Sequence, residues 1–397
     1  MKKISIIGDI MCEPSVLKSA KQKDGSYDFS GVFSELKPRF SEADFVIANL
    51  EFPMAGKEAK YTDTFVIFNG PDEFASAVKE AGIDVVSTIN NHTLDRGYDG
   101  MIRTLKVLDD IGLDHTGNFL PEKGREEAYY FEIDGVKFAL ICYTYTTNDK
   151  LPLDDENEQY INYLRYPRML TYLPEVSKKM NTWVEKVFKN MKEEHHASIK
   201  RFLGMTPVVI RADDYMDMDM INPYMEKFVS DIKTAKEKAD YVICYPHLGG
   251  QFNINPGKFS TYTMDVATKA GADIVVASHS HMVQKTDIVN DKFVAYSIGN
   301  VSMSPNSSLV IKECLPDYGI MLHLYFDGKT LAKKAFSIIV GVEKKGKLLT
   351  SYPVDVLYTK TTSKKEKTKI EKNVKTIYKV FTGKNLEGEI IQKEYDL

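Results

Sequence analysis

An α/β fold with a largely parallel inner sheet is the architecture that this sequence predicts. Short apolar runs rich in Val and Ile alternate with helical segments over the first 145 residues, and Gly, Asn or Pro bound each run. Parallel strands joined in this way have helices packed outside the sheet. The composition, 43% hydrophobic and 27% charged, is that of a folded protein, and 397 residues allow either one large domain with insertions or a core plus a smaller unit.

The elements of the first part follow from the period of the apolar residues. The alternation predicts strands at Ile4–Ile7, Phe45–Ala48 and Val85–Ile89, and helices at Phe33–Phe40, Asp72–Ala81 and Gly100–Gly112. Two further strands, Phe131–Ile133 and Lys137–Tyr143, are joined by Asp134-Gly135, whose residue types supply the positive backbone angles of a hairpin turn. An antiparallel element is therefore expected in the sheet.

The alternation stops between residues 147 and 222, which we interpret as an insertion or lid with a helix at Val176–Lys192. It resumes with helices at Pro223–Lys238 and Tyr262–Ala270 and strands at Tyr241–Tyr245 and Ile274–Ala277. Gly319–Phe326 and Lys334–Val342 follow as antiparallel strands around the turn Asp327-Gly328. The Lys-rich segment Thr359–Lys372 and the element Val374–Thr382 are typical of a solvated helix or tail. The expected division is a domain at residues 1–310 and a C-terminal extension at 311–397.

Charge and cysteine content argue against several classes of protein. A net charge of −4 and a pI near 6.1 disfavour nucleic-acid binding, which needs a clustered positive face, so small ligands are the simpler expectation. The four widely spaced cysteines predict buried thiols rather than a zinc knuckle. No window approaches the roughly 18 apolar residues of a membrane span. As written, the chain is expected to be cytoplasmic, or extracellular or membrane-associated if an export segment has been removed.

Residues of metal-ligand type stand at or just after the carboxyl ends of the predicted strands. Ligand sites in open α/β sheets form beyond these ends, so segments distant in sequence can converge there. Carboxylates, imidazoles and an amide oxygen can hold a divalent metal that lowers the pKa of water, and a shared carboxylate can bridge two such metals. The candidate residues are Asp9, Asn49, Glu51, Asn91, His92, His247, His279 and His281.

Each motif alone also has an ordinary structural explanation. His279 and His281, separated by the small Ser280, could turn toward one site or could be surface histidines. Asn90-Asn91-His92 could begin a helix with an Asn cap, or His92 could donate a proton to a leaving group. Asp95 could hold His92 in one tautomer, or could be a cap or a surface residue. The ordered set of motifs is what favours a metal-centred hydrolytic site.

The ordered motifs resemble the CapA-type poly-γ-glutamate capsule synthesis family, whose fold is similar to that of calcineurin-like metallophosphoesterases. The resemblance implies a four-layer αββα sandwich with two divalent ions, Mn, Fe or Zn. It implies Asp9, Glu51 and His281 at one ion and Glu51, Asn91, His247 and His279 at the other, with Glu51 as the bridge and His92 as the proton donor. The matching segments are Gly8-Asp9-Ile10-Met11, Ala48-Asn49-Leu50-Glu51, Asn90-Asn91-His92 with Asp95 and Gly97, His247 with Gly249, Gly271-Ala272-Asp273, His279-Ser280-His281 and Tyr296-Ser297-Ile298-Gly299-Asn300.

The sequence departs from the metallophosphoesterase pattern at three points. Met11 stands where the first motif commonly has His, so one metal lacks a ligand, which Asn49 or water could replace. Gly250-Gln251 stands where a Glu is often found after the histidine equivalent to His247. The usual Gly-His-Pro-His appears here as Ser278-His279-Ser280-His281.

Three functions are compatible with these residues. The leading one is a metal-dependent hydrolase that acts on a small phosphorylated substrate. The alternatives are a non-catalytic accessory of poly-γ-glutamate assembly or export, which would bind the acidic polymer or a capsule synthesis protein with help from Lys360–Lys372, and a metal-dependent amide hydrolase or transferase. Arg165 and Arg168 are candidate substrate contacts, because guanidinium binds carboxylate or phosphate in bidentate geometry. Metal affinity is expected to fall at acidic pH as histidine ligands become protonated.

Overall fold

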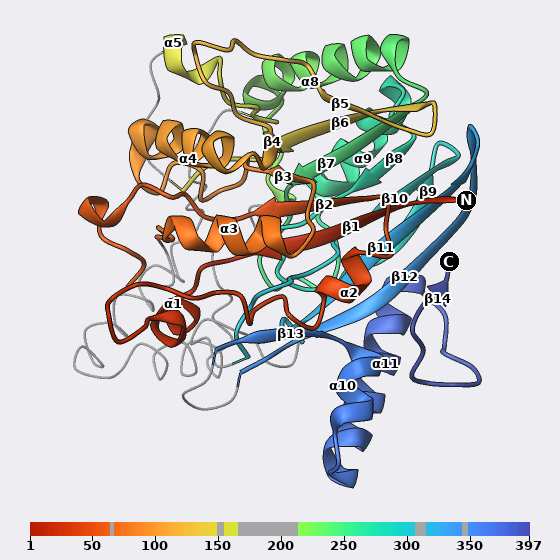
Figure 1. Ribbon diagram of the computed structural model, residues 1–397. Helices are drawn as coiled ribbons and strands as arrows, with labels where there is room; N and C mark the ends of the chain where they lie inside the picture. The colour runs from red at the N-terminus through yellow and green to blue at the C-terminus, as the bar shows by residue number, and fades with distance from the viewer. Residues whose placement is uncertain (64–66, 149–154, 166–212, 306–314, 344–347) are drawn as a thin grey trace, which may run out of the picture.

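Two β-sheets lie face to face, and helices cover the outer face of each sheet (Figure 1). This arrangement is seen in a computed structural model that describes residues 1–63, 67–148, 155–165, 213–305, 315–343 and 348–397. The α/β class and the four-layer αββα order are confirmed.

The first sheet has eight strands, and β1 lies near its centre. β2, β3 and β4 follow β1 in parallel, whereas β11, β12 and β13 extend the other side in antiparallel pairs. The C-terminal strands therefore complete the first sheet, while the proposed division at residue 310 stays a prediction. In spatial order the strands are β13 (Thr350–Pro353), β12 (Thr330–Val342), β11 (Tyr318–Asp327), β1 (Lys2–Ile10), β2 (Phe45–Leu50), β3 (Val85–Ser87) and β4 (Asp114–Thr116), and β14 (Tyr395–Asp396) pairs with β12.

The second sheet is parallel in its middle and has an antiparallel strand at each edge. Its first edge is the predicted hairpin, with Asp134 and Gly135 at φ values of 53° and 78°. The hairpin lies in this sheet and not in the sheet of β1 to β4. In spatial order the strands are β5 (Tyr129–Ile133), β6 (Val136–Thr144), β7 (Tyr241–His247), β8 (Ile274–Val276), β10 (Lys292–Ala295) and β9 (Thr286–Val289).

The helices form the two outer layers. α1, α3 and α4 contribute to the apolar cluster outside the first sheet, and α8 and α9 to the cluster outside the second. α10 and α11 follow the last long strands and project from the sheets near β13 (Figure 1). The bounds are α1 (Pro14–Ala20), α2 (Lys37–Phe40), the 3-10 turn η1 (Lys57–Ala59), α3 (Asp72–Glu80), α4 (Gly97–Ile111), α5 (Asp155–Glu158), α8 (Met218–Lys238), α9 (Lys258–Ala270), α10 (Val354–Lys360) and α11 (Lys364–Thr382).

Alternating side chains on the inner strands explain the layers. In β2, Val46 and Ala48 face the helices, whereas Ile47 between them joins the core that separates the two sheets. In β7, Ile243 and Tyr245 enter the same central core. The Tyr245 hydroxyl donates a hydrogen bond of 2.8 Å to the Ile7 carbonyl oxygen, which ties the two sheets together.

Several predicted boundaries are wrong by a few residues. The helix expected at Phe33–Phe40 is only the single turn α2, because Pro38 fits the first turn of a helix but has no N–H for a later turn. α4 begins at Gly97, and β3 ends at Ser87. α8 begins at Met218, where the Asp217 carboxylate accepts a hydrogen bond from the Asp219 N–H as an N-cap.

Other predictions fall outside the described residues. They are the helix at Val176–Lys192, most of the 147–222 insertion, Arg168 and Cys314. Cys12, Cys142 and Cys244 are buried free thiols, as predicted. Within the described ranges, no helix combines the length and the apolar character that a membrane span requires.

Gly8 is required where β1 meets the segment that follows β10. A Cβ atom at this position would lie 1.8 Å from the Gly299 carbonyl oxygen, which also accepts a 3.1 Å hydrogen bond from the Asp9 N–H. We expect Gly8→Ala to lower the free energy of unfolding by about 3 kcal/mol or more, since backbone must move to relieve the clash. Chemical denaturation measures this, with Gly31→Ala as the control because its Cβ meets only the end of the Leu348 side chain. Equal midpoints for the two variants would refute the steric argument.

Candidate metal centre

The carboxyl ends of five strands from both sheets direct polar side chains to one buried place. β1, β2 and β3 belong to the first sheet, and β7 and β8 belong to the second. Each of these residues is at most 4% exposed. The residues that meet are Asp9 in β1, Glu51 after β2, Asn91 and His92 after β3, His247 at the end of β7, and His279 and His281 after β8.

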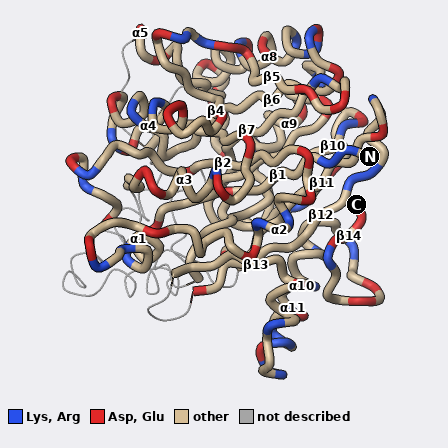
Figure 2. The backbone as a smooth tube through the Cα atoms, in the orientation of Figure 1, with Lys and Arg blue, Asp and Glu red and all other residues tan. Residues whose placement is uncertain are grey.

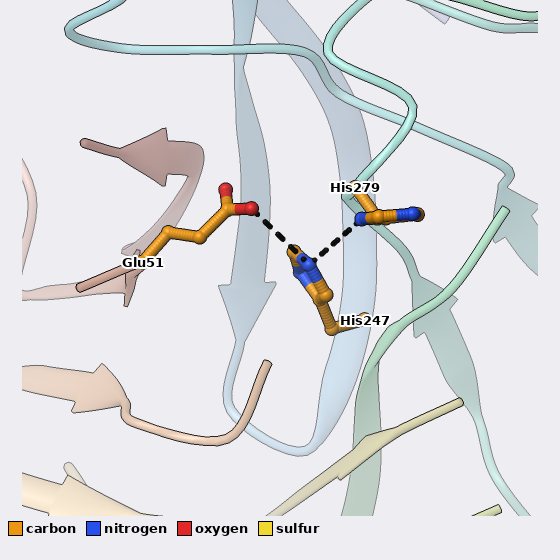
Figure 3. Close-up of side chains that lie close together, drawn as sticks. All are labelled: Glu51, His247 and His279. Atoms are coloured by element: carbon orange, nitrogen blue, oxygen red, sulfur yellow. Dashed lines mark hydrogen bonds and ion pairs between the residues drawn. The ribbon is translucent and has the colours of Figure 1, made fainter. Parts of the chain in front are cut away.

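The Glu51 carboxylate lies between two groups of potential metal ligands. One group contains Glu51, His247 and His279, and the other contains Asp9, Glu51 and His281. Figure 3 shows the first group, in which His247 Nε2 is 3.4 Å from Glu51 Oε1 and 3.1 Å from His279 Nδ1. These are the two sets that the family resemblance implies, with Glu51 common to both.

The spacing of the first group suits a metal ion. Bonds of about 2.0–2.2 Å to a common ion place neighbouring donor atoms about 3 to 3.5 Å apart. The distances from His247 Nε2 to Glu51 Oε1 and His279 Nδ1 match this range. Asn91 Oδ1 lies closer to the same nitrogen, at a hydrogen-bond distance of 2.7 Å. The Asn91 amide oxygen thus lies beside this group, and its role as a fourth ligand stays a prediction.

Both oxygens of the Glu51 carboxylate are buried without a hydrogen-bond partner among the described residues. The side chain is 0% exposed, and burial followed by the nearby Asp9 charge raises its pKa well above the usual value. A buried carboxylate without a donor is costly unless a cation compensates it. The residues present therefore fit a divalent metal, and this buried oxygen pair is the clearest sign of it.

Asp9 is the second carboxylate of the centre. Burial opposes its ionisation, but the hydrogen bond from His281 and the charges of His247 and His281 outweigh burial and lower its pKa to about 2. The His281 Nδ1–H donates to Asn300 Oδ1 at 3.0 Å, which leaves Nε2 3.7 Å from Glu51 Oε1. Asn300 thus selects the His281 tautomer whose Nε2 can bind a metal.

The Asn49 amide is hydrogen-bonded to neighbouring side chains on both its nitrogen and its oxygen, and its ligand role stays a prediction. Its amide nitrogen donates to Asp9 Oδ1 at 2.8 Å, and its amide oxygen accepts from Asn90 Nδ2 at 3.2 Å. Met11 places its side chain in the apolar cluster outside the first sheet. We therefore interpret Asn49 as a residue that orients Asp9, while the position of Met11 contributes no donor atom.

The loop of His279 and His281 has an unusual backbone. Both histidines have positive φ values, 112° and 54°, which cost free energy for residues with a side chain. The two rings are nevertheless only 5.8 Å apart, and the Asp9 carboxylate accepts a 3.1 Å hydrogen bond from the His279 N–H. Such local strain is typical of functional sites, where the surrounding contacts hold it in place.

His92 lies at the edge of the centre with its partner Asp95. The Nδ1–H donates to Asp95 Oδ2 at 2.5 Å, so Nε2 is left facing Glu51 Oε1 at 3.9 Å. The Phe68 ring stacks on the imidazole at 4.2 Å, and the Phe68 N–H also binds Asp95 at 2.6 Å. This geometry matches the tautomer-holding alternative for Asp95.

Asn148 is a contact that sequence reasoning missed. Its N–H donates to the Asn91 carbonyl oxygen at 2.7 Å, and its side-chain oxygen accepts from Asn91 Nδ2 at 3.1 Å. Its amide nitrogen lies 3.4 Å from Asp95 Oδ1. Asn148 follows the end of β6, so the strand-end rule would have selected it, but it lay in the segment interpreted as an insertion.

Arg165 is buried, with 3% of its surface exposed. Its guanidinium lies over the rings of Phe259 and Tyr145, at 4.5 and 5.2 Å, and the Tyr145 ring is in turn 4.6 Å from the His279 ring. Arg165 therefore lies behind Tyr145 relative to the histidine. Its assignment as a substrate contact stays a prediction.

The pKa shifts indicate which proton competes with the metal. Burial lowers the pKa of His247 to about 3 and that of His279 well below its usual value, so both are already neutral in mildly acidic solution. Glu51 has a raised pKa and binds the competing proton instead. Below that pKa we expect metal affinity to fall by up to about tenfold per pH unit. Calorimetric titration with Mn²⁺ in buffers of different ionisation enthalpy would detect the released proton, which Glu51→Gln should lack. Proton release that persists in this variant would assign the proton to another ligand.

The chain matches one described protein family. The family described as "Bacterial capsule synthesis protein PGA_cap" covers residues 3–304. Two curated relatives are the PGA biosynthesis protein CapA of Bacillus subtilis (strain 168), 25% identical over 298 residues, and the capsule biosynthesis protein CapA of Bacillus anthracis, 24% identical over 301 residues. Each match covers 75% of this chain but only 62% and 58% of the respective relative.

Two solved structures show a distant likeness to this chain. A hypothetical protein from Thermus thermophilus is 13% identical with a TM-score of 0.36, and the match covers 88% of this chain and 98% of that one. A Staphylococcus aureus structure described as a candidate 5'-nucleotidase is 12% identical with a TM-score of 0.39, covering 94% of this chain and 57% of that one. The fold assignment therefore rests on the strand order and the layers described above.

Proposed function

The chain belongs to the bacterial capsule synthesis protein family PGA_cap, and from this premise we propose that it is a metal-dependent hydrolase of capsule synthesis that cleaves a phosphoester bond. The observation that carries the proposal is the buried Glu51 carboxylate, which has no hydrogen-bond donor among the described residues and is shared by two groups of ligands. A site for polar recognition alone would supply donors to those oxygens. A bound cation would compensate a buried carboxylate that has no hydrogen-bond donor.

The residues divide into two metal sites and a proton donor. Glu51, Asn91, His247 and His279 would hold one ion, and Asp9, Glu51 and His281 the other. Divalent ions at these positions supply Lewis acidity and lower the pKa of water. We propose Mn, Fe or Zn, because the donor set mixes imidazole nitrogens with carboxylate and amide oxygens.

The chain itself contributes proton transfer and orientation. His92 is placed to give the proton on Nε2 to a departing oxygen, while Asp95 accepts from Nδ1 and stabilises the protonated ring. Asn148 contacts both Asn91 and Asp95, so it connects the metal ligand to the proton donor. Phe68 limits rotation of the His92 ring by stacking on it.

A substrate panel tests the proposal. Purified protein loaded in turn with Mn²⁺, Fe²⁺ or Zn²⁺ is assayed against phosphomonoesters, phosphodiesters and γ-glutamyl amides, with metal content measured on the same samples. Turnover of a phosphoester is the expected result. Turnover of amides alone would favour the amide hydrolase, and no turnover with fully occupied metals would favour the non-catalytic accessory.

A further inference from the structure

α11 has two faces of opposite character. One face buries Ile370, Val374, Ile377 and Phe381 in the central apolar cluster. The Lys-rich segment is therefore part of a docked helix and not a free tail. Because that apolar face is already packed, a ligand could reach only the opposite face of the helix. Binding there would depend on charge and hydrogen bonds.

The opposite face of α11 is a stripe of lysines. At about 100° per residue, six of the seven lysines of the helix fall within an arc of about 140°. The helix carries seven lysines against two glutamates, a net charge of +5, in a chain whose net charge is −4. Figure 2 shows lysine positions along this projecting helix. The lysine stripe consists of Lys364, Lys365, Lys369, Lys372, Lys375 and Lys379.

The charges of the lysine stripe are clustered on one helix face and are not compensated by neighbouring carboxylates. Within the described residues, no carboxylate forms an ion pair with any of the six. Elsewhere lysines commonly have partners, as in Lys236–Asp273 at 2.6 Å and Lys393–Glu42 at 2.8 Å. The Glu371 carboxylate on the same helix accepts a hydrogen bond from the Tyr358 hydroxyl instead.

A groove runs beside the lysine stripe. Its volume is about 470 Å³, and it is lined by Lys372, Lys375 and Lys379 together with Thr368, Thr376, Asn385, Leu386 and the Glu371 carboxylate. The groove thus offers three ammonium groups next to hydroxyl and amide donors, and the one carboxylate in its lining, Glu371, accepts the hydrogen bond from Tyr358. This combination suits a ligand that carries several carboxylates along its length.

We propose that the groove binds a linear polycarboxylate chain. The three groove lysines are separated along the helix axis by about 4.5 and 6 Å, and the whole stripe extends over about 22 Å, so charges repeated along an extended polymer can each meet an ammonium group. Neither Arg nor an exposed aromatic side chain lies in the stripe, so the bidentate phosphate contacts and base stacking of nucleic-acid sites are missing from this described helix.

A membrane surface fits this helix less well. Amphipathic helices that bind bilayers insert an apolar face, but here that face packs against Phe336 and Tyr395 of the protein. None of the exposed large hydrophobic residues in the described chain lies on α11. The choice of a polycarboxylate as ligand rests on the proposed role in capsule synthesis, while the groove itself is independent of the metal centre.

Binding of fluorescent poly-L-glutamate to the full chain tests the proposal by anisotropy. We expect binding that weakens with salt, and a loss of affinity of about tenfold or more in Lys372→Glu/Lys375→Glu/Lys379→Glu. The matched control is Lys18→Glu/Lys21→Glu/Lys23→Glu, which changes the net charge equally at exposed lysines near α1 and should bind as wild type. Circular dichroism confirms that each variant is folded.

The comparison ligands separate the outcomes. Equal loss in both triple variants would show that net charge alone attracts the polymer, and no loss in the groove variant would also overturn the proposal. Tighter binding of single-stranded DNA or of phosphatidylglycerol vesicles than of poly-L-glutamate would assign the stripe to a different partner. Glu51→Gln should bind the polymer as tightly as wild type does. The polymer-binding result therefore does not depend on whether the proposed hydrolase activity is found.

Discussion

Replacing Glu51 with Gln is expected to weaken divalent metal binding by more than about 100-fold, because the variant removes the one carboxylate shared by both ligand groups. The same change should stabilise the metal-free protein at neutral pH by on the order of 1 to 3 kcal/mol, since it removes a buried charge that has no donor among the described residues. Both results come from one structural feature. A residue with a purely structural role would not combine gain of stability with loss of metal.

The pH dependence of this stabilisation has a definite sign. The pKa of Glu51 is raised in the folded state by burial and by Asp9, so ionisation destabilises the fold as pH rises above the unfolded value. The gain in unfolding free energy of Glu51→Gln over wild type should therefore be larger at neutral pH than in acid. It should disappear at a pH where Glu51 is protonated in both the folded and the unfolded state. Thermal unfolding with and without Mn²⁺ over a pH series measures both effects.

Glu13→Gln provides the matched control for Glu51→Gln. Glu13 is also a buried glutamate, but its Oε2 accepts a 2.6 Å hydrogen bond from the Ser304 N–H. Loss of that charged acceptor should destabilise the protein and leave metal affinity close to wild type. If Glu51→Gln binds metal as tightly as Glu13→Gln does, the bridging assignment is wrong.

The convergence of the candidate ligands could be predicted because each of them lies at or just after the end of a strand that the sequence pattern identifies. Glu51 follows an apolar run whose period indicates β structure, and the same is true of His247 and His279. Parallel strands bring their carboxyl ends to a common edge, so position along the chain was enough to place these side chains together.

The sheet assignment of the hairpin could not be predicted in the same way. Periodicity identifies Tyr129–Ile133 and Val136–Thr144 as strands, but pairing with β7 rather than with β4 depends on tertiary contacts. The orientation of individual side chains could not be predicted from the sequence either. Asn49 has the right residue type for a ligand, yet Asn90 and Asp9 hold its amide, and only the structure shows these partners.

His92→Gln should reduce kcat for alkyl phosphoesters by about 10² to 10⁴ without changing the bound metal, because the role proposed for His92 is to donate a proton and not to bind the metal. The loss should be much smaller for p-nitrophenyl phosphate, whose leaving group departs without a proton. Asp95→Asn should reduce kcat by about 10- to 100-fold, since it removes the acceptor that holds the His92 Nδ1–H. Kinetics on both ester types, with metal analysis of each variant, measure these effects.

His115→Gln distinguishes this proton transfer from a general effect of losing an imidazole. His115 lies in β4, and its Nε2 is 3.3 Å from Asp109, remote from the metal ligands, so its replacement should leave kcat for both esters unchanged. The dependence on leaving group is the decisive readout, because misplaced metals would slow both esters alike. Equal losses for the alkyl and p-nitrophenyl esters in His92→Gln would therefore show that His92 positions the site and transfers no proton.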